Sequence, residues 1–302
     1  MIGQILPIFL DVIMPVFALV LIGYLVGPRL RLEASTLSRV SYYVFVPAFV
    51  FDIVSEAEVS LSAAARMVAY ILVLYTVCAL LGFGIAKALG RSRKMAAAYV
   101  LIAAFSNAGN FGLSLISFRL GEAALMPGTV YFLALVVVGF VIGVGAASWA
   151  EGAGLGAVAS VLKTPALLAL LPAAFFGITE IEIPLFLART VGLLRDAMIP
   201  VMLVTLGVQL AEVDNVRFSG DVVAASAVRL VASPLLGALL VGPFGLSGLA
   251  RSAGIIQASM PVAVLSSIIA IEYDVVPDFV TTSVLFSTLA SLFTLTAVLL
   301  WV

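Results

Sequence analysis

Long runs of apolar residues, each about the length of a lipid-crossing helix, alternate along the chain with short polar connections. A helix needs about 20 mostly apolar residues to cross the hydrocarbon layer of a bilayer. By this measure the sequence predicts ten transmembrane helices, near 5–26, 37–55, 64–89, 95–118, 123–149, 157–178, 184–211, 220–241, 249–271 and 278–301. Because the connections are short, we expect no inserted soluble domain, and we interpret the segment 151–165 as a flexible linker.

The composition limits what class of protein this can be. Of the 302 residues, 64% are hydrophobic and only 10% are charged, whereas a soluble domain has about half apolar and a quarter charged residues. Such a chain has too few polar side chains to cover an apolar core in water, so we interpret it as a polytopic protein of the lipid bilayer. The formal net charge of −1 argues against a nucleic-acid partner.

The residue types that enzymes and metal sites use are scarce. The chain has no histidine and a single cysteine, Cys78, which lies in an apolar run. It therefore cannot build a Cys/His metal site or an internal disulfide. A membrane-embedded enzyme would need a nucleophile with its base, or metal ligands. We expect no enzymatic activity, no metal and no cofactor.

Positive charge predicts how the helices are oriented, because cytoplasmic loops carry an excess of Lys and Arg. The run KALGRSRK at 87–94 is the strongest cluster. If this cluster lies inside, the N-terminus and the C-terminus of a ten-helix protein both lie outside. The inner ends then hold Arg29, Arg31, Arg39, Lys87, Arg91, Arg93, Lys94, Lys163 and Arg217, and the outer ends hold Arg66, Arg119, Arg189 and Arg251.

The two halves of the chain share landmarks at an offset of 153 residues. The offset places Pro47 of the second span on Pro200 of the seventh, and it aligns the polar breaks SNAGNFG and QASMPVA of the fourth and ninth spans. It also matches Ser106 with Ser259, Ser114 with Ser267, Ile116 with Ile269 and Thr129 with Thr282. Since each half has five spans, the second half enters the membrane with opposite polarity. The sequence thus predicts inverted repeats at 1–150 and 151–302, a plan common among secondary transporters.

The prediction of a transport site rests on the polar breaks in the fourth and ninth spans. Gly109 and Gly112 should loosen the fourth span, and Pro261 should interrupt the ninth, because Gly costs about 1 kcal/mol and Pro about 3 kcal/mol in a helix interior relative to Ala. Freed backbone groups are tolerated in hydrocarbon only where protein or a water-filled cavity satisfies them. Paired discontinuous helices therefore indicate a binding site. The alternative is that the Asn and Ser side chains merely join helices and the glycines merely allow close packing.

These stretches resemble the auxin efflux carrier family, and in particular its short bacterial members. The resemblance rests on SNAGNFGLSL at 106–115, GIIQASMPVAVLSSIIAIEYD at 254–274, the opening ILPIFLDVIMPVFALVLIGYLVG and the VPAFVF of the second span. It covers essentially the whole chain. It implies a fold related to the bile-acid sodium symporters, with a panel domain and a core domain in which spans four and nine are broken and cross. It also implies the cytoplasmic (inner) membrane of a bacterium and substrates such as malate or malonate.

Carried over by position, the resemblance implies that substrate binds beside the crossing. The residues are Asn107, Gly109, Asn110 and Gly112 with Ser259, Met260, Pro261 and Val262. Ser114 stands where many family members have proline. The ninth-span motif also lacks the acidic residue that the bile-acid symporters use for sodium, and only Gln257 lies nearby. The coupled ion stays open between a proton, sodium and none, with Ser106 and Gln257 as candidate ion ligands.

Ionisable residues inside predicted spans are further candidates, because they are costly in a membrane and commonly functional. Without histidine, a proton carrier has to be a carboxylate, and the candidates are Asp52 and Asp196. Arg195 is a candidate charge partner, with a structural pair to Asp196 as the alternative. Arg229 is expected either to pair with Asp196 or to bind an anionic substrate through its planar fork.

These observations together predict a secondary active transporter of a small organic anion, a mono- or dicarboxylate, working by alternating access. The alternatives are an uncoupled uniporter or channel-like exporter, and a membrane sensor of the same fold that moves no substrate. Tyr42 and Tyr43 are interpreted as interfacial aromatics. Gly139 and Gly143 form a small-residue face that is expected to pack within the protomer, with a homodimer as the alternative.

Overall fold

The computed structural model describes residues 6–56, 61–151, 164–179, 181–213 and 216–302, and these are helical apart from turns, short connections and one isolated β-bridge. Seven helices are long and apolar enough to cross a membrane. They run over Leu6–Leu30, Ala34–Ser55, Leu61–Ala88, Glu122–Ala150, Leu185–Ala211, Gly220–Leu240 and Pro277–Leu299. The prediction of an all-helical, polytopic membrane protein is confirmed.

Several of these seven spans contain a π-helical turn. The elements in order are η1 (Phe9–Ile13) with α2 (Met14–Leu30); α3 (Ala34–Val40), η2 (Ser41–Phe45) and α4 (Val46–Ser55); α5 (Leu61–Ala88); η4 (Glu122–Ala124) with α8 (Leu125–Glu151); α11 (Leu185–Ala211); α12 (Gly220–Ala227), η6 (Val228–Ala232) and α13 (Ser233–Leu240); and α16 (Pro277–Leu299). Pro47 follows the turn η2 at the start of α4, whereas Pro200 lies inside the continuous helix α11. The two matched prolines therefore have different local structures.

The remaining three predicted spans are not continuous helices. The fourth consists of α6 (Arg93–Ala104), η3 (Ala108–Gly112) and α7 (Leu113–Leu120), and the ninth consists of α14 (Gly248–Ala258) and α15 (Leu265–Glu272). The sixth consists of the short helices α9 (Pro165–Leu168) and α10 (Leu170–Thr179). The predicted start of the sixth span and nearly all of the expected linker at 151–165 lie outside the described residues.

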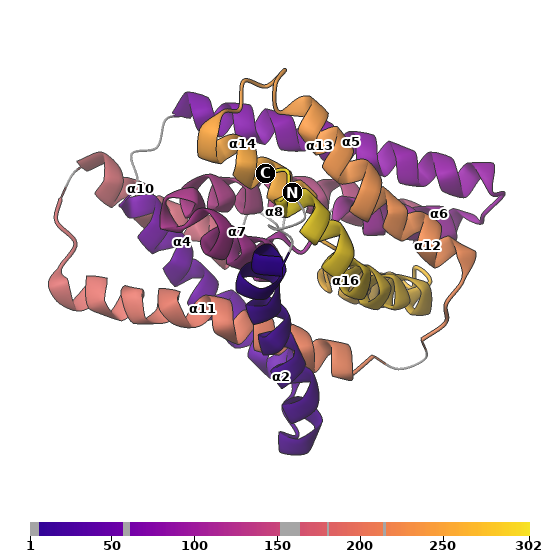
Figure 1. The fold of residues 1–302 in the computed structure, drawn as a ribbon, viewed down its shortest axis with the longest axis horizontal. Helices are drawn as coiled ribbons and strands as arrows, with labels where there is room; N and C mark the ends of the chain where they lie inside the picture. Colours follow the sequence, from indigo (N-terminus) through magenta and orange to yellow (C-terminus); the bar gives the residue numbers. More distant parts are fainter. Residues whose placement is uncertain (1–5, 57–60, 152–163, 180, 214–215) are drawn as a thin grey trace.

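The helices form two groups that pack mainly within themselves (Figure 1). We call α2, α3, α4, α9, α10 and α11 the panel group, and α5 to α8 with α12 to α16 the bundle group. In Figure 1, α10, α4, α11 and α2 occupy the left and lower part of the molecule, and α5, α6, α12 and α13 lie along the top and right. The fourth and ninth predicted spans both belong to the bundle group.

Two glycines let α2 and α11 cross at backbone contact distance within the panel group. A Cβ atom built on Gly207 would overlap the carbonyl oxygen of Val20 and would lie 2.9 Å from the Cα of Gly23. A Cβ atom built on Gly23 would in turn overlap the carbonyl oxygen of Val204. Small residues at such crossings let helices gain van der Waals contact where lipid offers no hydrophobic drive.

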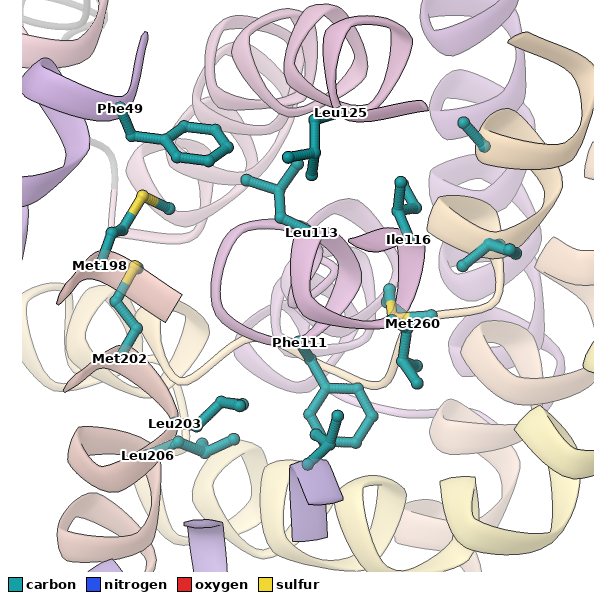
Figure 2. Close-up of a cluster of buried hydrophobic side chains, with 14 of the residues drawn as sticks. Phe49, Phe111, Leu113, Ile116, Leu125, Met198, Met202, Leu203, Leu206 and Met260 are labelled. Carbon is teal, nitrogen blue, oxygen red and sulfur yellow. The ribbon is translucent and has the colours of Figure 1, made fainter. Parts of the chain in front are cut away.

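The two groups meet across an apolar, methionine-containing cluster (Figure 2). The panel group contributes Phe49, Met198, Met202, Leu203 and Leu206, and the bundle group contributes Phe111, Leu113, Ile116, Leu125 and Met260. Figure 2 shows the two methionines of α11 on one side of the cluster and Ile116 beside Met260 on the other. Methionine is flexible and fits irregular surfaces, which suits the boundary between the two helix groups.

Candidate functional site

The first break in the bundle group lies at Phe105–Asn107, upstream of the glycines where the sequence predicts it. Helix α6 ends at Ala104, and Phe105 is extended, with φ −113° and ψ 108°. Gly109 and Gly112 lie afterwards, inside the π-helical turn η3. The prediction that these glycines cause the break is therefore wrong in position. Asn107 itself, with φ −77° and ψ 53°, is not helical.

The two glycines instead permit close approach of neighbouring elements. A Cβ atom on Gly109 would lie 2.9 Å from the ring of Phe132, and one on Gly112 would overlap the side-chain oxygen of Gln257. Ser114, where proline was expected in this family, follows η3 and donates to the carbonyl oxygen of Asn110 over 2.7 Å. Ser114 is the second residue of helix α7.

The second break, between α14 and α15, pairs with the first through their backbones. The amide of Asn107 donates to the carbonyl oxygen of Pro261 over 2.8 Å, and the amide of Ala263 donates to that of Phe105 over 3.1 Å. Together with the antiparallel bridge between Ser106 and Val262, these bonds satisfy groups that the helix breaks set free. Pro261 sits where the missing amide of proline costs nothing in this pairing.

The glycine pair of α8 packs against the first break. A Cβ atom on Gly139 would lie 3.1 Å from the ring of Phe105, and one on Gly143 would overlap that ring. The expected packing of this small-residue face within the protomer is confirmed.

A cavity of about 410 Å³ opens beside the paired breaks, between the two helix groups. Its wall from the first break consists of Phe105, Ser106, Asn107, Gly109 and Asn110, and α8 adds Phe132, Leu135, Val136 and Phe140. The panel side consists of Ser38, Arg39, Ser41, Tyr42, Tyr43, Val46, Thr164, Ala166, Met202, Thr205 and Gln209. The wall is mostly apolar, and polar groups are concentrated at the break and at the ends of α3 and α11.

Asn107 holds the one observation that points most directly to a ligand. Its side chain is buried, it lines the cavity, and its amide nitrogen Nδ2 has no hydrogen-bond partner in the structure. A buried donor without an acceptor costs roughly 1–3 kcal/mol. An acceptor atom that entered the cavity would remove this cost. Asn110, which is half-buried, lines the same wall.

The residues predicted from the ninth span lie one layer behind the cavity wall. Ser259, Met260, Pro261 and Val262 are buried and do not line it, and the hydroxyl of Ser259 donates back to the carbonyl oxygen of Ile255. The wall on this side is formed by Ala263, Val264, Leu265 and Ile268. Gly112 likewise lies outside the wall. The structure thus brings together Asn107, Gly109 and Asn110 but not the whole predicted set.

The panel side of the cavity was missed by the sequence analysis. Arg39 is the one charged residue among the described residues that line the cavity, and Gln209 donates to the hydroxyl of Ser38 over 3.0 Å. Tyr42 and Tyr43, which we interpreted as interfacial aromatics, belong to the same wall. In the sequence, this side of the cavity is marked only by polar residues at one end of the second and seventh spans, such as Arg39 and Gln209. Nothing in the sequence indicates that these residues lie opposite the first break.

The ion-ligand candidates Ser106 and Gln257 are both engaged with neighbouring groups. The hydroxyl of Ser106 lies 2.7 Å from that of Tyr75, which in turn accepts from Tyr131 over 3.0 Å. Gln257 is fully buried and donates to the carbonyl oxygen of Gly128 over 3.3 Å, while its side-chain oxygen has no hydrogen-bond partner. Neither interaction identifies an ion.

Asp52 and Arg195 form an ion pair at the opposite end of the panel from Arg39. The Nε of Arg195 lies 3.2 Å from a carboxylate oxygen of Asp52, which is buried. Arg195 also pairs with Glu122, at the start of the span that contains α8. The cluster therefore joins α4 and α11 of the panel group to the bundle group. Asp196 is exposed and pairs with neither arginine, so the expected Arg195–Asp196 pair is wrong.

Arg229 is fully buried in the bundle group and does not contact Asp196, which corrects one of its two expected roles. It also does not line the cavity, so it is not placed to bind a ligand there directly. Its donors go to the carbonyl oxygens of Ala103 and Ala258 and to the hydroxyl of Ser233. These partners belong to the two broken spans and to α13.

Comparison with known proteins shows similarity to membrane transport proteins. The family described as Membrane transport protein matches residues 157–299. An uncharacterized transporter of Methanothermobacter thermautotrophicus is 27% identical over 294 residues, which cover 94% of this chain and 95% of that protein. An uncharacterized transporter of Methanocaldococcus jannaschii is 23% identical over 97% of both chains.

A shorter stretch is similar to plant proteins. Auxin efflux carrier component 1 of Arabidopsis thaliana is 31% identical over 129 residues, which are 39% of this chain and 21% of that protein. The aligned stretch thus spans about a fifth of the length of the plant relative.

Proposed function

Because the chain belongs to the auxin efflux carrier family of membrane transport proteins, we propose that it is a secondary transporter of a small organic anion. The observation that carries the proposal is the unpartnered amide donor of Asn107 in the wall of the cavity where the two breaks pair. A carboxylate oxygen is a strong acceptor for such a donor. Neither a nucleophile–base pair nor a metal site is needed for this role, so we propose no enzymatic activity.

The architecture we propose is ten crossing segments in two inverted repeats, 1–150 and 151–302. Its support is that helix starts in the two halves correspond to within two residues of the 153-residue offset. Helices α6, α7 and α8 begin at 93, 113 and 125, and α14, α15 and α16 begin at 248, 265 and 277. The paired breaks are then the crossing of the fourth and ninth spans. Contact between η1 and α16 brings the first and last helices together.

The cargo we propose is a mono- or dicarboxylate such as malate or malonate. Amide donors of Asn107 and Asn110 would hold one carboxylate at the break, and Arg39 offers a positive charge towards the other end of the cavity. The volume of about 410 Å³ leaves room for a small organic acid with some water. The wall between these polar groups is apolar, so it would favour an acid whose carbon chain is long enough to place its two carboxylates at the two polar ends.

The transport step we propose is a movement of the bundle group against the panel group. The positive-inside rule places Arg39, at the polar end of the cavity, on the cytoplasmic side, so the structure would be inward-facing in the cytoplasmic membrane of a bacterium. The cluster of Asp52, Arg195 and Glu122 would close the outer side. The methionine-containing interface of Figure 2 would repack as the groups slide.

The test is counterflow in proteoliposomes made with the purified protein. Labelled carboxylates are offered to vesicles preloaded with the same unlabelled acid, under imposed pH, sodium and voltage gradients. Accumulation of chemically unchanged label supports a carrier. A sensor would bind the acid without counterflow. An uncoupled uniporter would show counterflow, but a proton or sodium gradient would not drive its net uptake of the acid against a concentration gradient. Absence of both binding and counterflow for the whole panel would overturn the proposal.

Sidedness gives a prediction that needs no substrate. We expect Ser38→Cys to react with a membrane-impermeant thiol reagent from the cytoplasmic side, because Ser38 lines the cavity. The matched control is Ser247→Cys, at an exposed position before α14, which should react from the outer side only. The native Cys78 is buried and should stay silent. Labelling of both positions from the same side would contradict the proposed orientation, and a transported acid should slow the labelling of Ser38→Cys.

Proton coupling gives a second prediction at the outer ion cluster. We expect a pH gradient to stimulate uptake by the wild type several-fold, and we expect Asp52→Asn to lose this stimulation, because the amide can neither bind a proton nor pair as an anion with Arg195. Asp196→Asn tests the other candidate carboxylate. Asp11→Asn, exposed in η1, is the matched control and should respond as the wild type does. A full response in both Asp52→Asn and Asp196→Asn would exclude coupling through these groups.

A further inference from the structure

Arg229 is the largest fully buried side chain among the described residues, and it does not line the cavity. It lies in η6, the π-helical turn between α12 and α13. Such turns are rare, and they occur frequently at functional sites.

The guanidinium group of Arg229 donates to both broken spans at once. Nη1 lies 3.0 Å from the carbonyl oxygen of Ala103, and Nη2 lies 2.8 Å from that of Ala258. Nε makes a longer contact of 3.4 Å with the carbonyl oxygen of Met260. Ser233 accepts from Nη2 over 2.9 Å and donates to Ala258, so α13 supports the same point.

Ala103 and Ala258 occupy the last turns of α6 and α14, and this position explains the geometry. The last carbonyl groups of a helix lack partners within the helix, and this end carries a partial negative charge. Two such ends meet at the breaks, in an interior where like charges repel strongly. A cation between them removes the repulsion and satisfies the carbonyl groups.

Arg229 has no acidic counter-charge among the described residues. An uncompensated buried cation is costly, so the two helix ends have to supply the compensation. The ring of Tyr75, 5.1 Å from the guanidinium carbon, adds a further favourable contact. The charge and the helix ends therefore stabilise each other.

We infer that Arg229 is a fixed cation that holds the C-terminal ends of the two broken spans together, so that this point of the fold needs no bound alkali-metal ion. Carbonyl oxygens at helix ends are the ligands that sodium would use, and here the guanidinium group occupies them. Arg229 is thus a positioning residue for the site and not a binding residue.

The consequence for transport rests on the proposed function. Tyr75, which packs on Arg229, lies within hydrogen-bonding distance of Ser106 in the cavity wall. Arg229 thus supports, through Tyr75, the part of the cavity wall where the anion would bind. Transport of this anion should proceed equally in sodium, potassium or choline chloride, because the cation at the crossing is part of the protein.

The experiment compares Arg229→Lys, Arg229→Ala and the control Arg217→Ala, whose side chain is exposed. The first readout is the thermal unfolding temperature of purified protein with and without millimolar guanidinium chloride. We expect guanidinium to raise the unfolding temperature of Arg229→Ala alone, because the free ion can fill the vacated place. Arg229→Lys keeps the positive charge but loses the planar guanidinium group. Its unfolding temperature should therefore lie between those of Arg229→Ala and the wild type.

The second readout is counterflow, for which we expect a loss of about tenfold or more in Arg229→Ala and partial recovery with guanidinium. If Arg229→Ala does not fold, Arg229→Lys is compared with Arg229→Met, and equal unfolding temperatures would overturn the inference. A requirement of the wild type for sodium, or no guanidinium effect on a folded Arg229→Ala, would also overturn it. If no acid is transported at all, the proposed function fails, while the unfolding measurements still decide the role of Arg229.

Discussion

Asn107→Ala is expected to lower counterflow of the transported acid by about 10- to 100-fold while leaving the protein folded. A hydrogen bond to a charged group contributes roughly 1.5–3 kcal/mol, which corresponds to this range in affinity. The folded protein should tolerate the change, because the amide nitrogen of Asn107 makes no hydrogen bond that would be lost. The unfolding temperature should therefore stay the same or rise slightly, since an unsatisfied buried donor is removed.

The measurement is initial counterflow in proteoliposomes, together with the unfolding temperature in detergent. Asn110→Ala should have a smaller effect, because Asn110 is only half-buried. The matched control is Ser283→Ala, a buried polar residue of α16 that bonds within its own helix and lies away from the cavity. Wild-type rates in both asparagine variants would refute a carboxylate site at the first break.

Gly207→Val is expected to destabilise the panel group severely. Any side-chain atom at this position overlaps the carbonyl oxygen of Val20 in α2, and backbone cannot move aside as a flexible side chain can. Overpacking typically costs about 1–3 kcal/mol and occasionally more, and a direct backbone clash belongs at the upper end. We expect the unfolding temperature to fall by roughly 5–10 °C, with a matching loss of purified yield.

The control for this prediction lies in the same helix. Gly192→Val puts the same residue into α11 at a position where a Cβ atom would meet nothing within 4 Å. Both variants carry the same helix-propensity change, so their difference isolates the crossing of α2 and α11. Equal unfolding temperatures would show that the two helices do not need this contact.

The transmembrane plan could be predicted because hydrophobicity is a local property of each segment. The long apolar runs gave seven continuous spans close to the expected boundaries, and Pro261 marked the second break correctly, since proline cannot donate in a helix interior. The first break was placed a few residues too late, at the glycines. Its true position, Phe105–Asn107, depends on pairing with a segment more than 150 residues further along the chain.

Only part of the candidate site could be predicted from the sequence, because its two sides come from segments far apart along the chain. Asn107, Gly109 and Asn110 could be predicted because polar residues stand out in an apolar run. Arg39 and Gln209 could not, because an Arg or Gln near a helix end looks like an ordinary interfacial residue until a cavity is seen beside it.

A polytopic helical membrane protein with two interrupted spans could be predicted, because composition, periodicity and proline act within single segments. The pairing of the breaks, the completion of the cavity by α3 and α11, and the contact of Arg229 with two helix ends became known from the packed structure alone. The physical reason is that these interactions join groups far apart in sequence, such as Arg229 and Ala103 at a separation of 126 residues. A buried charge acquires its role from the partners that packing brings to it.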